Sequence, residues 1–141
     1  MVRSSSTKVL VIDDDQATTD LLTLMLEKDF EVIVAHTGED GIYAVRQYNP
    51  HAIILDVLLP DEKGWQICKS IREFSQIPIL MLSALAESGM MMRALELGAD
   101  DFLTKPVSPR ILVAYINRLS QRAQAELEAE ALKANFQPSI P

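Results

Sequence analysis

Short runs of apolar residues alternate with amphipathic stretches along the whole chain, and this alternation limits the fold more than any other feature. The apolar runs are rich in Val, Ile and Leu, and we expect strands at residues 8–13, 30–35, 52–56, 78–82 and 101–104. Continuously apolar strands are typical of parallel sheets, which are buried on both faces. Strands that alternate with helices predict an α/β fold with helices on both faces of the sheet. The sequence therefore predicts a doubly wound parallel sheet of about five strands.

The stretches between these runs carry apolar residues at helical spacing. We expect helices at residues 16–28, 37–48, 65–74, 87–97 and from 108 onwards, with residues 59–64 as a loop. The last helix has Ser108 in the N-cap position and Pro109 in the first turn, both favoured there.

The last helical pattern continues well past the domain that it closes. Residues 121–133 are rich in Ala and Glu, which favour helix but offer few large apolar side chains. The simplest interpretation is a solvated helix end. The alternative is a thin seam for a partner helix, carried by Ala123, Leu127 and Ala131 or Leu132. We expect a polar tail at residues 1–7, one domain at 8–120, and a helical extension or linker at 121–141.

Composition narrows the class of protein. The 141 residues suit one domain, no apolar run is long enough to cross a bilayer, and the start lacks the apolar centre of a secretory signal. The single cysteine agrees with a reducing compartment, so we expect a cytoplasmic protein. The net charge of −7 argues against direct binding to nucleic acid.

Polar residues stand where four of the predicted strands end. Asp13 and Asp14 close the first apolar run, Asp56 the third, Ser83 the fourth, and Lys105 follows the fifth. Because the carboxyl ends of parallel strands share one edge, where ligands bind, we expect these side chains to meet. Three carboxylates attract a hard divalent cation, and a lone Lys supplies a point charge for phosphate. The alternative is a structural role, in which these acids only cap the ends of strands.

These residues lie in motifs that resemble the receiver domain of two-component response regulators. The matching segments are residues 11–15, residues 55–60 with Gly64, residues 82–84 and residues 98–106. The resemblance covers about Lys8 to Leu119 and implies a flavodoxin-like sheet in the strand order 2-1-3-4-5, flanked by five helices and, here, followed by an extended C-terminal helix.

The resemblance also implies roles for individual residues. Asp56 is expected to accept the phosphoryl group. Asp13, Asp14 and Asp56 are expected to hold Mg²⁺ with the backbone carbonyl of Leu58, Asp14 as a direct ligand and Asp13 through a water molecule. Lys105 is expected to pair with the phosphoryl group and to precede a cis peptide bond to Pro106.

A switch is implied as well, and it would use Ser83 and Ala84 beside the phosphoryl group and the aromatic ring of Phe102. It would rearrange the face made by the fourth helix, fifth strand and fifth helix, for a partner or a homodimer. The possible interface residues are Arg93, Asp100, Asp101, Ile111 and Tyr115. Other expected partners are a histidine kinase or phosphotransfer protein upstream, and a downstream protein or an output domain outside this sequence.

Two other functions remain open at this point. One is a metal-dependent phosphatase of the haloacid dehalogenase type, which also uses an aspartyl phosphate and whose start is superficially similar to Asp13-x-Asp15. Against it, Asp100 and Asp101 precede Lys105, whereas the lysine of those phosphatases precedes a later acidic pair. The other is a scaffold with the receiver fold but a silent acid site. For the receiver itself we expect no enzymatic activity beyond its own phosphorylation and dephosphorylation.

Overall fold

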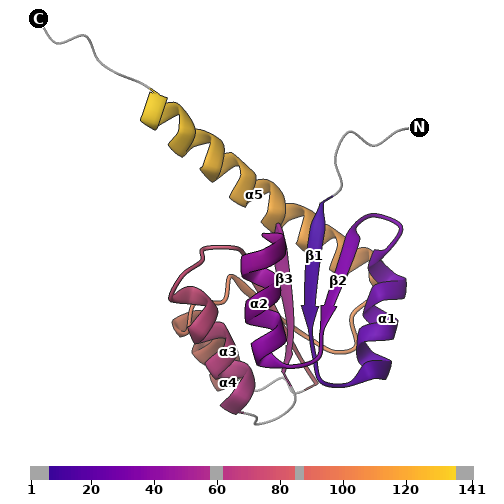
Figure 1. The fold of residues 1–141 in the computed structure, drawn as a ribbon. Helices are drawn as coiled ribbons and strands as arrows, with labels where there is room; N and C mark the ends of the chain where they lie inside the picture. Colours follow the sequence, from indigo (N-terminus) through magenta and orange to yellow (C-terminus); the bar gives the residue numbers. More distant parts are fainter. Residues whose placement is uncertain (1–6, 58–61, 85–87, 136–141) are drawn as a thin grey trace, which may run out of the picture.

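The computed structural model describes residues 7–57, 62–84 and 88–135, and these form a five-stranded parallel sheet covered by helices (Figure 1). The elements alternate along the chain, as the sequence predicts. They are listed here with their bounds: β1 Lys8–Ile12, α1 Gln16–Leu26, β2 Glu31–Ala35, α2 Gly38–Tyr48, β3 Ala52–Val57, α3 Glu62–Arg72, β4 Ile79–Ser83, α4 Ser88–Glu96, β5 Asp101–Thr104 and α5 Pro109–Asn135.

The strand order is β2-β1-β3-β4-β5, and every neighbouring pair is parallel, which confirms the predicted topology. Because alternate residues of a strand point to opposite faces, β1 sends Val9 and Val11 to one side and Leu10 and Ile12 to the other. The sheet therefore carries two separate hydrophobic cores.

One core lies under α1 and α5, and the other lies under α2, α3 and α4. The first contains Leu22 and Leu26 of α1 together with the α5 residues Leu112, Ile116 and Leu119. The second contains Val45, Ile71 and Ala94, with the thiol of Cys68. Burial raises the pKa of this thiol, which agrees with a structural role for the only cysteine.

The helix ends follow local chemistry. Thr37 caps α2 through its side-chain oxygen, which accepts from Asp40 N, and the C-cap Asn49 after α2 lies in the left-handed region. Ser108 caps α5 by accepting a hydrogen bond from Ile111 N at 3.2 Å, as predicted. Gly98 follows α4 with a φ of +105°, a conformation that favours glycine.

Three helix boundaries differ by two residues or more from those predicted. α1 ends at Leu26 rather than at residue 28, and α3 spans Glu62–Arg72 rather than residues 65–74. The predicted loop at residues 59–64 is wrong for residues 62–64, and residues 59–61 lie outside the described residues. Gly64 instead lies buried in the first turn of α3, where Glu62 and Lys63 are favourable helix residues.

α5 continues without interruption for 27 residues and projects from the sheet (Figure 1). Ser120 is its last buried residue, and Leu127 and Leu132 are exposed by 61% and 72%. The predicted helical extension is therefore present up to Asn135, whereas the domain boundary at residue 120 remains a prediction. In the part of the chain that the structure describes, no helix is both long and apolar enough to cross a membrane.

Candidate functional site

The register of the sheet brings the predicted polar residues to one edge. Ile12 pairs with Leu55, so Asp13 follows β1 at the level of Asp56. On the other side of β3, Val57 pairs with Ser83, and Ser83 pairs with Thr104 of β5. Lys105, which follows Thr104, therefore lies at the same edge, and its backbone N–H donates to the carbonyl of Ser83 at 2.7 Å.

Asp56 and Lys105 form the central ion pair of this edge. The Lys105 Nζ atom lies 2.5 Å from Asp56 Oδ2, and the Asp56 side chain is fully buried. This contact is an ion pair, without the angular geometry of a hydrogen bond. Asp56 Oδ1, Asp56 Oδ2 and Asp13 Oδ2 are buried oxygens that lack a hydrogen-bond partner among the described residues. Such oxygens are ready acceptors for a cation.

Asp13 differs chemically from an ordinary aspartate. Burial raises its pKa from 3.8 to about 7, although the hydrogen bond from Asp15 N lowers it, and the nearby charge of Asp56 raises it further. That hydrogen bond reaches Asp13 Oδ1 at 3.1 Å and fixes the orientation of the carboxyl. The result is a carboxyl that is poised between its neutral and charged forms at neutral pH.

The other predicted ligands of Mg²⁺ are Asp14 and the backbone carbonyl of Leu58. The side chain of Asp14 is exposed, although its carboxyl is close enough to Asp13 to affect the Asp13 pKa. Leu58 lies outside the described residues. Within those residues no three His, Cys, Asp or Glu side chains are arranged to hold a metal ion by themselves. Mg²⁺ usually keeps several water ligands, so the two buried acids with unpartnered oxygens still fit it.

The predicted switch residues lie beside this edge. Ser83 is fully buried at the end of β4, and the following Ala84 is exposed. Phe102 is 4% exposed and packs into the core with Met81 and Ala94. The peptide bond between Lys105 and Pro106 is cis.

Several residues of the predicted interface already have partners within the same chain. Asp100 and Asp101 pair with arginines of the same chain. Arg93 lies over the ring of Trp65 at 5.5 Å. Ile111 is 51% exposed on α5, while Tyr115 is half-buried beneath the guanidinium of Arg118. An interface formed by these residues remains a prediction.

Sequence reasoning missed the arginine partners of these two aspartates, Arg72, Arg118 and Arg122. A signal was present, because Arg118 and Arg122 are four residues apart and so share one face of a helix. It also missed the hydrogen bond that the backbone N–H of Asp15 donates to Asp13, because a pattern of side chains does not reveal backbone donors.

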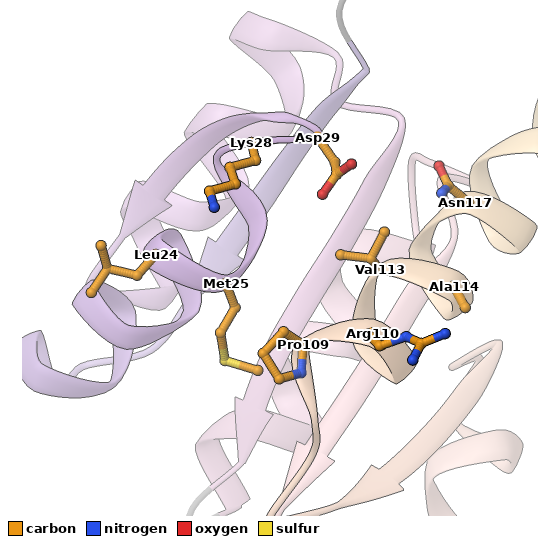
Figure 2. Close-up of a pocket in the computed structure, with 9 residues that line it drawn as sticks. All are labelled: Leu24, Met25, Lys28, Asp29, Pro109, Arg110, Val113, Ala114 and Asn117. Atoms are coloured by element: carbon orange, nitrogen blue, oxygen red, sulfur yellow. The ribbon is translucent and has the colours of Figure 1, made fainter.

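A groove on the described surface lies away from this edge. It has a volume of about 620 Å³ and lies between α1 and α5 (Figure 2). Its walls include Met25 from α1, Lys28 from the turn that follows α1, and Arg110 and Val113 from α5. None of the acids that we predicted to form the site lines it, so this groove is separate from the acid site.

Comparison with known proteins agrees with this geometry. Residues 9–117 match the family described as the response regulator receiver domain. The alkaline phosphatase synthesis transcriptional regulatory protein PhoP of Bacillus subtilis is 38% identical over 128 residues, which cover 89% of this chain and 53% of that protein. The transcriptional regulatory protein AfsQ1 of Streptomyces coelicolor is 39% identical over 119 residues, which cover 84% of this chain and 53% of that protein.

Solved structures give the same result. The crystal structure of a response regulator from Chloroflexus aurantiacus, described there as putative, is 33% identical with a TM-score of 0.76, covering 83% of this chain and 99% of that one. This chain spans about half the length of the curated relatives named above. The match does not support the alternative of a haloacid-dehalogenase-like phosphatase. A sequence match over residues 9–117, with the sheet order and acid edge described above, shows that the chain belongs to the response regulator receiver domain family, whose members are phosphoacceptor signalling domains.

Proposed function

We propose that Asp56 is the phosphoacceptor of this domain. The observation that carries the proposal is the burial of its carboxylate against Lys105, with both carboxylate oxygens free of hydrogen bonds within the described residues. Such a carboxylate is held in place and is not occupied by other donors. Asp13 lies beside it and adds a further buried oxygen.

The reaction needs positive charge because a carboxylate and a phosphoryl group repel each other. Mg²⁺, held by Asp13, Asp14, Asp56 and the Leu58 carbonyl, would offset that repulsion. Lys105 neutralises Asp56 before the reaction and can pair with the transferred phosphoryl oxygens afterwards. An Asp56 oxygen attacks phosphorus, the bond from phosphorus to the donor nitrogen of a phosphohistidine breaks, and the bonding electrons stay with that nitrogen. Water later hydrolyses the mixed anhydride.

The switch is proposed to start at Ser83 and Ala84. A phosphoryl oxygen on Asp56 is a strong acceptor for the Ser83 hydroxyl and the Ala84 N–H. Movement of Ser83 would open space for the ring of Phe102, which is already buried beside β4. This shifts the population between two arrangements of the α4-β5-α5 face.

The wider function follows from this reaction. We propose a histidine kinase or phosphotransfer protein as donor, and a downstream protein, an output domain or a second copy as receiver of the signal. The relatives are transcriptional regulators twice as long as the matched region, so any contact with DNA would be made outside it. The chain would catalyse only its own phosphorylation and dephosphorylation, in the cytoplasm.

The test is incubation with acetyl phosphate, a small phosphodonor, followed by intact-mass measurement. We expect a mass gain of one phosphoryl group that requires Mg²⁺ and is lost in Asp56→Asn. The matched control is Asp20→Asn, an exposed acid of α1, which should still be labelled. Absence of labelling in the parent chain would favour a silent scaffold, and sustained turnover of phosphate esters would favour a phosphatase.

A further inference from the structure

Two ion pairs join α5 to the start of β5 at the point where the helix leaves the domain. Arg118 Nη2 donates to Asp101 Oδ2 at 3.0 Å, and Arg122 Nη2 donates to Asp100 Oδ1 at 3.1 Å. The two arginines are one helical turn apart, and the two aspartates are adjacent in sequence. We call these four residues the α5 clamp.

Asp100 is a fixed anchor rather than a mobile surface acid. Its Oδ2 atom accepts hydrogen bonds from Ile79 N at 2.8 Å and from Arg72 Nη2 at 2.7 Å. Arg72 is itself held, because it also donates to the carbonyls of Gly98 and Ile77. Asp100 is therefore tied to the start of β4 and to the turn between α4 and β5, while its Oδ1 atom holds Arg122.

The clamp lies where the buried part of α5 ends. Leu119 and Ser120 are the final buried residues, and beyond them only Ala123 is half-buried up to residue 134. Residues 121–135 continue a helix that is already formed and make few buried contacts of their own. The contacts at their base therefore have a large influence on where this segment points.

We propose that the α5 clamp sets the direction in which residues 121–135 leave the domain and couples that direction to β5. β5 is four residues long and is followed at once by Lys105, which contacts Asp56. A shift of Lys105 and Phe102 would therefore be passed along one short strand to Asp100 and Asp101. The static part of this proposal stands alone, whereas the coupling rests on the proposed function of Asp56.

The static part is tested by spin-label distances in the complete 141-residue chain. Labels are placed at Gln47→Cys on α2 and Ala129→Cys on the extension, both exposed, in a Cys68→Ala background. We expect a single narrow distance distribution that broadens in the double variant Arg118→Gln/Arg122→Gln. Both arginines are more than half exposed, and unfolding curves verify that the variants fold.

Two controls make this result specific. Arg110→Gln removes an exposed arginine of the same helix outside the clamp and should leave the distribution narrow. The exchange Asp101→Arg/Arg118→Asp reverses one ion pair. Its distance distribution should stay narrower than that of Arg118→Gln alone. A distribution of equal width in the parent and the double variant would overturn the proposal, because the packing of α5 alone would then fix the extension.

The coupling is tested by adding beryllofluoride and Mg²⁺, with fluorine NMR as a separate report of binding at Asp56. We expect the distance to shift in the parent, and this shift to be lost in the double variant while the bound fluorine signal persists. A bound signal without a distance shift in the parent would overturn the coupling. Absence of the bound signal would instead refute the proposed function of Asp56 and leave the static result in place.

Discussion

Competition between a proton and Mg²⁺ at Asp13 gives a quantitative test of the acid site. Burial raises the pKa of Asp13 to about 7 in the metal-free protein. At pH 6 about nine in ten Asp13 side chains therefore carry a proton, and at pH 8 about one in ten do. A carboxyl that holds a cation, directly or through a water molecule, does so as the charged carboxylate, so the proton should leave when the cation binds. The apparent affinity for Mg²⁺ should rise about tenfold from pH 6 to pH 8.

The assay is calorimetric titration of Mg²⁺ into the protein in two buffers of different ionisation heat. The difference in heat gives the number of protons released, which should be about 0.9 per Mg²⁺ at pH 6 and about 0.1 at pH 8. Asp13→Asn should lose the release, and Asp20→Asn should retain it. Equal affinity at both pH values, with no proton released, would refute the argument, because Asp13 would then have an ordinary pKa.

The same shift predicts how stability depends on pH. The folded pKa of Asp13 lies above its unfolded value of 3.8, so the native state binds more protons between about pH 4 and pH 7. The contribution of protonated Asp13 to the free energy of unfolding is fully present below pH 3.8 and is lost as pH rises through about 7. The stability difference between the parent and Asp13→Asn, both without metal, should therefore change over this range, in favour of the variant at higher pH. Saturating Mg²⁺ should reverse that trend for the parent.

Three further predictions concern the fold and are measured by urea unfolding. Leu112→Ala empties a fully buried position and should lower the free energy of unfolding by about 2–5 kcal/mol; a loss below about 1 kcal/mol would show that the core collapses around it. Gly98→Ala places a Cβ 2.7 Å from Arg72 Cγ at a φ of +105°, and should cost about 1–3 kcal/mol, whereas Gly89→Ala in α4 meets no atom within 4 Å and should be neutral or stabilising. Arg46→Ala removes a guanidinium 3.9 Å from the centre of the Phe74 ring and should cost about 0.5–1 kcal/mol; an unchanged midpoint would mean that this exposed pair contributes nothing.

The sequence contained enough information to predict the sheet and its acid edge. Residues such as Ile53, Ile54 and Leu55 are apolar on both faces of their strand, and only a sheet covered on both sides buries them all. Once the strands are parallel, the residues that follow them share an edge, so Asp13 and Asp56 become neighbours. The strand order itself came from the resemblance to receivers, since parallel strands of similar composition do not specify their own order.

What the sequence did not predict depends on three-dimensional partners. Asp100 resembled a surface or interface residue because its sequence neighbours show nothing of Arg72 or Arg122, which lie 28 and 22 positions away. The early start of α3 was missed as well, and it too depends on the folded environment, because glycine is by itself a poor helix former. Burial of Gly64 in the folded protein changes that balance.

The raised pKa of Asp13 and the unpartnered oxygens of the acid edge have one physical explanation. A buried acceptor without a hydrogen bond costs about 1–3 kcal/mol, a sizeable part of the roughly 5–15 kcal/mol by which a domain is stable. A proton on Asp13 reduces this cost when no cation is bound, because it removes one of two neighbouring negative charges. A divalent cation reduces it further, since it satisfies oxygens of both acids. Among the described residues, Asp13 Oδ2 and Asp56 Oδ1 have no protein donor, and Asp56 Oδ2 has only the ammonium of Lys105 beside it. The stability of this edge therefore depends on whether a proton, a cation or a phosphoryl group is present, which is what a signalling site requires.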